Sequence, residues 1–547
     1  MKLLTQRRTP PLSRRDFLAT GVGLTATVDS LLAASHDAQP AAAAEPRVAT
    51  GPFDTFREYV AALEAHGQLL RFDKVDQDAY EGTAIMYRLV DKYGIWGAPA
   101  ILFEQVKING EWLQGPLIGN DQGPWAAEAI AFGLTPVPHD GWATYRQAKA
   151  YFTDILRKSG GSYPQIAPLE VTPDKAFCKE VVLRGDDIDL TRFAFIQVNP
   201  ADQGRYINTG SVFTADPDMG VNFGTYRCHL RGPRKIGVNP EPNQTGWKML
   251  MRAKERGEKI AKVSIALSND PVVWMISGSR VGNRRGDAPV DELAIAGGLR
   301  GRPLEVVRSE TNDLLVPAHA EMVIEGEIPL DDFEPEGPYG EMYGYMGLYK
   351  EENFWMNVTA VTHRRNPWLM NSFTGVNRGT LKAAGDALAV MSLQRMIPGL
   401  VDYHTTNDAT GISFVSIDKT RPGQGLEVGK QIAERISIAK VVLVVDSDLD
   451  VVKRTDMLLA LGSRWQPHPA SHIYEELRGM PLDPSTPNRP MSSKIVIDAT
   501  RQWPEEGGPA VYADLNRTLL VKGSPEVFDR VDARWGEVMN NWRCRDA

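Results

Sequence analysis

The feature that most constrains the fold is a long central stretch in which short strand-like segments follow one another. Between residues 179 and 363, runs rich in β-branched and aromatic residues alternate with turn residues such as Pro217 and Gly220. Short strands at this spacing are typical of a β-barrel or a split barrel. A helix is expected within the stretch, at about 247–257. The expected strands are Lys179–Leu183, Tyr206–Thr214, Tyr226–Leu230, Val272–Ile276, Leu304–Val307, Glu321–Ile324 and Trp355–His363.

Both flanks of this stretch mix helices with strands, which is typical of α/β domains. Helices are expected at 53–72, 143–158, 383–396, 429–438, 457–461 and 525–542, and strands at 101–106, 413–417 and 441–445. A chain of 547 residues is also too long for one ordinary core. We therefore expect an N-terminal α/β domain at 45–170, a central split-barrel domain at 171–370 and a C-terminal α/β domain with a terminal helix at 371–547.

Composition excludes some classes of function. The formal net charge is -8 and there is no Lys/Arg run, so no electrostatic footprint for nucleic acid is present. The apolar fraction of 42% and the charged fraction of 24% are those of a soluble globular protein. Beyond the N-terminus no stretch of 18 apolar residues occurs, so no transmembrane span is expected.

The first 44 residues have the pattern of a twin-arginine export signal followed by a linker. The paired Arg14 and Arg15 precede Phe17 and Leu18, a weakly apolar run follows, and small residues occupy 38–44. We expect a periplasmic or exported protein; the alternative is a cytosolic protein with a disordered tail. Because this route moves folded proteins, a cofactor inserted before export is expected. The three cysteines, Cys178, Cys228 and Cys544, form neither a disulfide framework nor a zinc motif.

The strongest local motif is the sequence Glu-Gly-Pro-Tyr-Gly-Glu, from Glu336 to Glu341. A turn of this kind folds two carboxylates toward one cavity. Close carboxylates separate their pKa values, so one of them can stay protonated as an acid. The other interpretation is an acidic surface turn, because Asp331, Asp332 and Glu334 lie nearby.

Two further motifs precede it. The segment from Asn222 to Arg227 enters a strand, where an arginine can hold a carboxylate through two hydrogen bonds; alternatively Arg227 is a surface residue of an edge strand. Glu292 opens a small apolar stretch that ends at Gly301. It is a candidate ligand for a hard metal ion, although taken alone a helix N-terminal acid is the better interpretation.

In this order and spacing the three motifs resemble those of the UbiD family of reversible decarboxylases. The family elements N-x-x-x-Y-R, E-x-x-x-x-G-G-x-x-G and E-G-P-[FY]-G-E-x-x-G-Y begin here at Asn222, Glu292 and Glu336. The resemblance covers essentially the whole chain after the export signal. It implies prenylated FMN as cofactor, a divalent metal that is usually Mn²⁺, K⁺ at the flavin phosphate, and a C-terminal domain used for oligomerisation.

The resemblance also implies a role for each residue. Arg227 matches the arginine of the family's Glu-Arg-Glu triad, which holds the substrate carboxylate and tunes the flavin. Glu336 matches the glutamate that orients this arginine, and Glu341 matches the proton donor. Asn222 and Glu292 match two metal ligands near the flavin phosphate.

The chain departs from the family pattern at the third metal ligand. The family places a histidine about 18 residues after the arginine, but 239–245 contains none. His229 shares a strand face with Arg227, where it either lines the site or is a barrel histidine. Lys419 lies in a loop that resembles the family's basic segment, so it is a candidate partner of the phosphate or else a surface lysine. The acids Asp446, Asp448 and Asp450 are interpreted as turn residues rather than a metal site.

The expected activity is that of a carboxy-lyase: a non-oxidative decarboxylase of an aromatic or α,β-unsaturated carboxylic acid. The expected partners are this small-molecule acid, a flavin prenyltransferase that supplies the cofactor, and further copies of the chain in a dimer or larger homo-oligomer. The alternative is an exported flavin-binding protein without decarboxylase activity. A hydrolase is disfavoured because the chain has no G-x-S-x-G motif.

Overall fold

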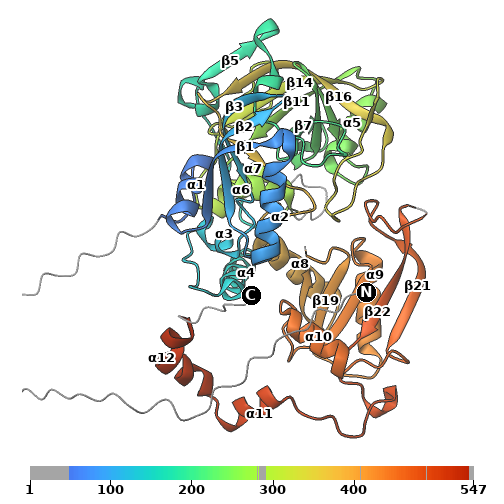
Figure 1. Cartoon of the computed structure of the whole chain (residues 1–547). Helices are drawn as coiled ribbons and strands as arrows, with labels where there is room; N and C mark the ends of the chain where they lie inside the picture. Colours follow the sequence, from blue (N-terminus) through green and yellow to red (C-terminus); the bar gives the residue numbers. More distant parts are fainter. Residues whose placement is uncertain (1–48, 280, 283–290, 407, 488, 541–547) are drawn as a thin grey trace, which may run out of the picture. The chain divides into compact units, whose positions relative to one another are not determined.

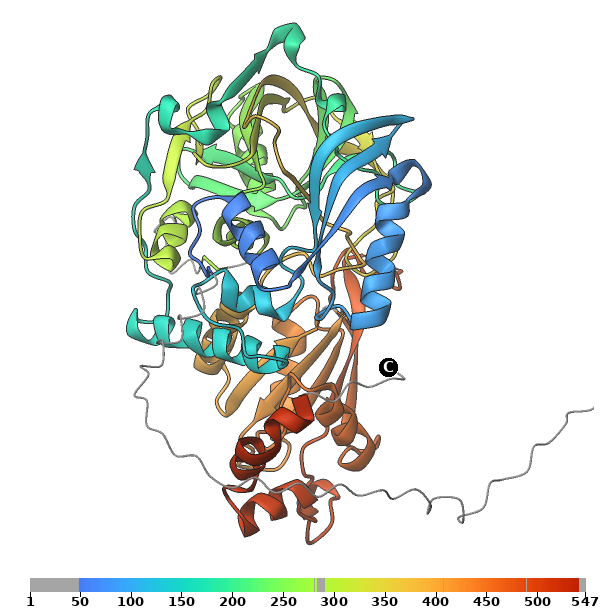
Figure 2. The same ribbon diagram turned by 60° about the vertical axis from the view of Figure 1, so that its left-hand side comes forward.

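The computed structural model describes residues 49–279, 281–282, 291–406, 408–487 and 489–540. The expected export signal at 1–44 and Cys544 lie outside these residues. The described chain is a mixed α/β protein whose central sheet curls into an open half-barrel, and the expected fold class is confirmed (Figures 1 and 2). Within these ranges no helix is long and apolar enough to cross a bilayer.

The N-terminal part contains a sheet of four described strands in the order β1-β2-β3-β17. The helix expected at 53–72 is shorter than predicted. It begins after Thr55, which forms a capping box with Glu58, and ends before Gly67, whose φ of 67° favours glycine. The next residues form a strand. The elements are α1 (Phe56–Ala65), β1 (Leu69–Asp76), α2 (Glu81–Tyr93), β2 (Ala100–Ile108), β3 (Glu111–Gly119), α3 (Trp125–Ile130), α4 (Gly141–Lys158) and β17 (Leu369–Asn371).

The central half-barrel contains ten described strands, eight of them in the order β6-β9-β10-β16-β14-β11-β7-β8, with β5 and β15 paired to β16. The strand expected at Tyr206–Thr214 is divided into β6 and β7. The half-barrel strands are β5 (Val181–Arg184), β6 (Tyr206–Ile207), β7 (Ser211–Asp216), β8 (Gly220–Thr225), β9 (Arg227–Gly232), β10 (Lys235–Asn239), β11 (Ile260–Leu267), β14 (Met322–Pro329), β15 (Glu334–Glu336) and β16 (Lys350–His363).

Smaller elements accompany the half-barrel. A three-stranded sheet of described residues has the order β13-β12-β4. The helix expected at 247–257 is present as α5. These elements are β4 (Leu169–Glu170), α5 (Thr245–Glu255), α6 (Pro271–Gly278), α7 (Glu292–Arg300), β12 (Glu305–Arg308) and β13 (Leu315–Pro317).

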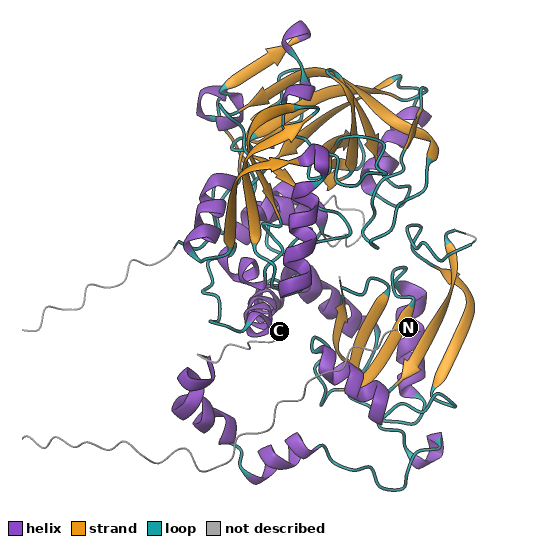
Figure 3. Cartoon of the chain, viewed as in Figure 1, coloured by secondary structure: helices purple, strands orange, loops and turns teal. Residues whose placement is uncertain are grey.

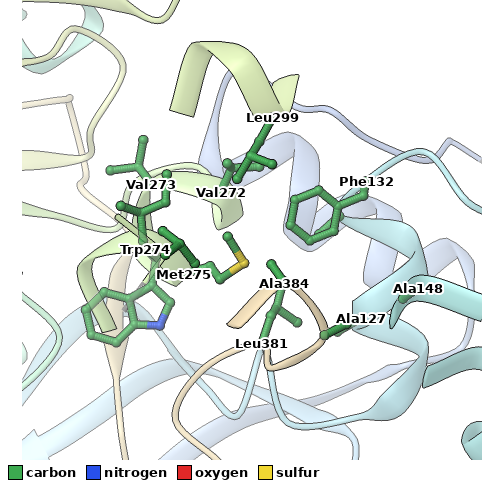
Figure 4. Close-up of a cluster of buried hydrophobic side chains, with 14 of the residues drawn as sticks. Ala127, Phe132, Ala148, Val272, Val273, Trp274, Met275, Leu299, Leu381 and Ala384 are labelled. Atoms are coloured by element: carbon green, nitrogen blue, oxygen red, sulfur yellow. The ribbon is translucent and has the colours of Figure 1, made fainter. Parts of the chain in front are cut away.

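The strand expected at Val272–Ile276 is wrong, because these residues belong to helix α6. The carboxylate of Asp270 accepts hydrogen bonds from the backbone N–H groups of Val272 and Val273, at 3.0 and 3.3 Å, and Pro271 occupies the first turn. Figure 4 shows side chains of α6 beside Phe132, Leu299, Leu381 and Ala384. Since residues 271–277 of α6 are all buried, their apolar run has no amphipathic period and does not distinguish a helix from a strand.

The C-terminal part is an α/β domain with a sheet of five described strands in the order β18-β19-β20-β22-β21. Strands β19, β20 and β22 are parallel, and helices α9 and α10 lie against β20 (Figure 3). The elements are α8 (Ala383–Met396), β18 (Leu400–Thr405), β19 (Ile412–Ile417), α9 (Gln424–Arg435), β20 (Val441–Asp446), α10 (Arg454–Ser463), β21 (Ser471–Arg478), β22 (Met491–Asp498), α11 (Asn516–Gly523) and α12 (Val527–Asn540).

A buried ion pair links α3 to the segment that leads into α8. The side chains of Arg378 and Glu128 are both 0% exposed, and Arg378 Nη1 lies 2.6 Å from Glu128 Oε1. Glu128 also accepts hydrogen bonds from the backbone N–H groups of Lys382 and Ala383, at 2.7 and 3.2 Å. The carboxylate therefore joins two parts of the chain that are distant in sequence.

Replacing Arg378 with methionine is expected to reduce the free energy of unfolding by about 3–5 kcal/mol, because it leaves the Glu128 carboxylate buried without its cation. Urea titration of the variant and the wild type measures this loss. The matched control is Arg365→Met, since Arg365 is 80% exposed and pairs loosely with Glu180. We expect the control to change stability by less than about 0.5 kcal/mol. Equal effects of the two substitutions would contradict the account.

Candidate active site

The structure brings Arg227, Glu336 and Glu341 into direct contact. Arg227 opens strand β9, Glu336 ends β15, and Glu341 follows in the next turn. Arg227 Nη2 donates to Glu336 Oε2 at 2.7 Å and Nε donates to Glu336 Oε1 at 3.1 Å, while Nη1 donates to Glu341 Oε1. The three side chains are 9%, 1% and 9% exposed. One guanidinium group thus lies between two buried carboxylates.

The turn between the two glutamates is fixed by hydrogen bonds to residues from another part of the chain. Asp202 Oδ1 accepts a hydrogen bond from the backbone N–H of Gly340 at 2.8 Å, and Gln203 Oε1 accepts one from Gly337 at 2.9 Å. Gly337 has a φ of 89°, which disfavours other residues. A Cβ on Gly340 would lie 2.3 Å from Asn199 Nδ2, so a larger residue at this position would have to displace the Asn199 side chain. These constraints direct both carboxylates toward Arg227.

The pKa values of the two carboxyl groups move in opposite directions. Burial acts to raise the pKa of Glu336, but the hydrogen bonds and charge of Arg227 outweigh it and hold the pKa below its ordinary value. Burial also has the largest influence on Glu341, and there it prevails over the attraction of Arg227 and raises the pKa. Glu336 is therefore suited to remain ionised against Arg227, and Glu341 is suited to carry a proton.

A cavity of about 680 Å³ lies beside this triad. Four predicted site residues line it: Asn222, Arg227, Glu292 and Glu341. Glu336, a fifth, does not line the cavity but contacts Arg227. Five of the six predicted site residues therefore belong to one region. Other lining residues come from the beginning of α5, the end of α6 and the segment 372–380. A cavity of this volume accommodates a cofactor-sized ligand.

The two predicted metal ligands lie on neighbouring elements, β8 and α7. Glu292 Oε2 accepts a hydrogen bond from the backbone N–H of Phe223, at 3.0 Å, which brings Glu292 next to Asn222. Where the family histidine is expected, Gln244 and Thr245 line the cavity. Within the described ranges no group of three His, Cys, Asp or Glu side chains is arranged to hold a metal ion. The chain therefore provides an amide and a carboxylate at this position.

Lys419 does not reach this cavity. Its ammonium group donates to Thr500 Oγ1 at 2.9 Å, to the backbone carbonyl of Arg501 at 3.1 Å and to Glu506 Oε2 at 2.5 Å. The side chain is 3% exposed. In this structure Lys419 is therefore a buried cation of the C-terminal domain rather than a residue at the cavity.

His229 and the acidic cluster after β20 also have structural partners. The ring of His229 stacks on Tyr206, with ring centres 4.9 Å apart, and does not line the cavity. Burial lowers its pKa to about 4. Asp446 and Asp448 form ion pairs with Arg464, and Arg501 binds Asp448 at 2.7 Å. These carboxylates are neutralised by arginines, which agrees with their interpretation as turn residues.

The structure adds residues that the motifs did not indicate. Tyr206 donates its hydroxyl hydrogen to Glu336 Oε1 at 2.9 Å, and the ring of Tyr339 lies 5.1 Å from the guanidinium carbon of Arg227. Lys350 donates to Asn239 and Glu241, at 2.8 and 2.5 Å. Tyr339 lies inside the Glu336–Glu341 motif, so its place near the site could have been predicted from the sequence. The contact of Tyr206 depends on the pairing of β6 with β9, which no local pattern indicates.

Comparison with protein families identifies two matching domain models, both from the UbiD group. The Rift-related domain of 3-octaprenyl-4-hydroxybenzoate carboxy-lyase matches residues 170–377. The C-terminal domain of the same carboxy-lyase matches residues 380–499. The triad, the cavity residues on β8 and α7, and the C-terminal sheet all lie within these two matches.

Solved structures resemble the chain over most of its length. Vanillic acid decarboxylase of Sedimentibacter hydroxybenzoicus, in its open form, is 25% identical, with a TM-score of 0.75 over 90% of this chain and 100% of that one. The UbiD-class enzyme HmfF of Pelotomaculum thermopropionicum in complex with FMN is 27% identical, with a TM-score of 0.71 over 86% and 100%. An evolved dimeric form of HmfF in complex with prenylated FMN is 26% identical, with a TM-score of 0.68 over 87% and 98%.

Replacing Arg227 with methionine is expected to destabilise the protein by about 3–5 kcal/mol at neutral pH, because Glu336 loses its cation while remaining buried. In the wild type the lowered pKa of Glu336 gives a stabilising contribution that is lost as the pH falls through the folded-state value. In the variant, Glu336 is buried without a cation beside it, and this burial raises the pKa of its carboxyl group. The difference in stability should therefore be largest near neutral pH and should shrink on acidification.

Urea titrations from about pH 5 to about pH 8 measure this difference. The matched control is Arg234→Met, because Arg234 is 49% exposed and pairs with the fully exposed Asp186. It should change stability by less than about 0.5 kcal/mol at every pH. A deficit in Arg227→Met that stays constant across this range would contradict the assigned electrostatics.

Proposed function

Because this chain belongs to the UbiD family of carboxy-lyases, we propose that it is a non-oxidative, reversible decarboxylase of an aromatic or α,β-unsaturated carboxylic acid. The observation that carries the proposal is the triad itself. A buried arginine contacts two carboxylates whose pKa values move in opposite directions, at the wall of a cofactor-sized cavity. A protein that only bound a flavin would have no need of this arrangement.

Each member of the triad has a separate task. Arg227 binds the carboxylate of the substrate, because its planar group of N–H donors matches a carboxylate. Glu336 occupies Nε and Nη2 of Arg227 and so fixes the direction of the guanidinium group. Glu341 delivers a proton to the substrate carbon from which the carboxylate has left, and its raised pKa suits that task.

Decarboxylation breaks one carbon–carbon bond. The carboxylate leaves as carbon dioxide, and its bonding electron pair stays with the substrate. No side chain stabilises such a pair on an aromatic or vinylic carbon, so prenylated FMN, when bound, supplies the electron sink. The proton from Glu341 then completes the new carbon–hydrogen bond, and Glu341 regains a proton from solvent. Burial of the triad limits access of water to the reacting carbon.

Two observations on this chain support the flavin. The cavity is large enough for a cofactor, and Asn243, Gln244 and Thr245 at the beginning of α5 line it. The side chain of Gln244 does not cap this helix, although the Tyr226 hydroxyl accepts a hydrogen bond from the backbone N–H of Gly246 at 3.1 Å, and a helix N-terminus suits a phosphate group. The complexes of HmfF with FMN and with prenylated FMN add support by similarity.

We assign Asn222 and Glu292 as two oxygen ligands of a Mn²⁺ ion, with K⁺ beside the flavin phosphate. Amide and carboxylate oxygens suit this metal, and the two side chains lie on neighbouring elements at the cavity. Residues 239–245 supply no histidine as a third ligand, so the protein part of the coordination shell consists of these two side chains. Elemental analysis of the purified holoprotein tests it, and a manganese content near zero would remove the metal from the proposal.

The twin-arginine motif supports export of a folded, loaded protein. A flavin prenyltransferase would supply the cofactor before export, and the mature protein would act in the periplasm or outside the cell as a homo-oligomer. Replacing Arg14 and Arg15 with lysine should keep the protein in the cytoplasm, as measured by cell fractionation. Unchanged fractionation of that variant would contradict export by this route.

Replacing Glu341 with glutamine is expected to lower the rate of carbon dioxide release by about 100-fold or more, because the amide cannot donate the proton, while flavin content stays unchanged. The assay uses protein from cells that make prenylated FMN and a panel of aromatic and α,β-unsaturated acids. Glu352→Gln is the matched control and should retain full activity, because Glu352 is exposed near the beginning of β16. Full activity of Glu341→Gln would refute the assignment.

The same assay distinguishes the decarboxylase from the alternative function, a flavin-binding protein without this activity. A flavin-loaded wild-type protein that releases carbon dioxide from none of these acids would favour an exported flavin-binding protein. The departure at 239–245 is the observation that motivates this alternative.

A further inference from the structure

A second layer of aromatic side chains lies behind the triad, and Tyr206 is at its centre. Tyr206 belongs to β6 and pairs in register with His229 of β9, two residues beyond Arg227. It is 1% exposed. Its hydroxyl donates to Glu336 Oε1 at 2.9 Å, and Tyr206 is not among the residues that line the cavity.

The ring of Tyr206 packs against two other aromatic rings. The His229 ring stacks on it at 4.9 Å between centres, with the planes 24° apart, and the Tyr339 ring packs against it at 4.5 Å. Tyr339 in turn lies against the guanidinium group of Arg227. A ring clamped in this way presents its hydroxyl to Glu336 in a single direction.

The hydrogen bonds of Glu336 show how the Tyr206 hydroxyl fixes the orientation of the carboxylate. Oε1 accepts from both Tyr206 and Arg227 Nε, and Oε2 accepts from Arg227 Nη2. With Oε1 fixed by the tyrosine, the carboxylate cannot rotate out of the plane of the guanidinium group without losing a hydrogen bond. Nη1 of Arg227 is left pointing toward Glu341 and the cavity.

We propose that Tyr206 is a positioning residue of this site, whose clamped hydroxyl fixes the Glu336 carboxylate so that Arg227 presents its remaining N–H donors to the substrate carboxylate. The catalytic part of this inference depends on the proposed decarboxylase function. The structural part, in which Tyr206 stabilises the ionised form of Glu336, does not.

The other ionisable groups near Glu336 also contribute to the dependence of activity and stability on pH. They are Arg227, Cys228 and His229 on β9, Lys350 on β16, Glu341 in the turn and Asp202 before β6. Burial lowers the pKa of His229 to about 4 and raises that of Cys228, so both are neutral at mildly acidic and neutral pH. Burial opposes the charge of Arg227, but Glu336 and Glu341 raise its pKa above the ordinary value, so Arg227 keeps its charge throughout. The acid-side change is therefore dominated by carboxyl groups.

The test is Tyr206→Phe, which keeps the ring and removes the hydroxyl. We expect kcat to fall by about tenfold or more, as for loss of a hydrogen bond to a charged group, with little change in KM or flavin content. Because the lost donor stabilised the ionised carboxylate, the pKa of Glu336 should rise. The acid limb of the kcat/KM profile should therefore move to higher pH.

A second readout does not need activity. In the wild type the stabilising contribution of ionised Glu336 is lost as the pH falls through its lowered folded-state pKa. In Tyr206→Phe this loss should begin at higher pH, which is measured as the acid-side midpoint of the melting temperature plotted against pH. The matched control is Tyr59→Phe, because Tyr59 is also fully buried and donates one hydrogen bond, at 2.7 Å, to the carbonyl of Asp121. It should lower the melting temperature without moving either pH midpoint.

Incorporation of 3-fluorotyrosine at position 206 provides an isosteric variant if Tyr206→Phe does not fold. Its hydroxyl is a stronger donor, so both midpoints should move to lower pH. Unchanged midpoints in whichever variant folds would overturn the inference. A wild-type protein that releases no carbon dioxide would instead refute the proposed function, and the stability midpoints would still decide the role of Tyr206.

Discussion

The site depends on a single buried arginine that satisfies two carboxylates at once. Taking ions out of water costs several kcal/mol for each ion, and only good geometry with additional hydrogen bonds offsets that cost. Arg227 meets this requirement by donating through Nε and Nη2 to Glu336 and through Nη1 to Glu341. Removal of Arg227 would leave both carboxylates buried without their cation. The surrounding chain is therefore organised to hold three side chains in one arrangement.

The half-barrel supplies that arrangement from segments far apart in sequence. Arg227 begins β9, and Glu336 ends β15, which pairs with the first residues of β16. The segment before β6 holds the intervening turn through Asp202, and β6 itself provides Tyr206. The opposite shifts of the two carboxyl pKa values follow from this packing, because Glu336 receives most of the hydrogen bonds of the cation and Glu341 receives fewer. The division of tasks in the proposed mechanism thus has a geometric origin.

The proximity of several candidate residues could be predicted from the sequence because they lie in three compact motifs. Arg227, Glu336 and Glu341 meet as expected, and Asn222 and Glu292 line the same cavity. The helix expected at 383–396 coincides with α8. Its prediction needed only the spacing of apolar residues that are neighbours in the sequence. The strand expected at Val272–Ile276 was wrong because a helix buried on all sides shows no amphipathic period, although Asp270 and Pro271 carried a helix-start signal.

Other features depended on long-range contacts and were not predictable from the chain alone. Lys419 was a candidate for the phosphate, but its ammonium group is bound by Glu506, 87 residues away. The role of Tyr206 arises from the pairing of β6 with β9 and from its contact with a glutamate 130 residues away. Single-sequence patterns describe neighbours along a helix or strand, whereas these contacts are decided by how the strands of the half-barrel pair.

The most direct test of the account is the fate of solvent hydrogen during turnover. The flavin-loaded protein is incubated in D₂O with an acid that it decarboxylates, and the products are analysed by NMR and mass spectrometry. The account predicts equal amounts of carbon dioxide and of a product with one deuterium at the carbon that carried the carboxylate. A product with oxygen at that carbon, or one without deuterium there, would contradict non-oxidative decarboxylation with protonation by Glu341.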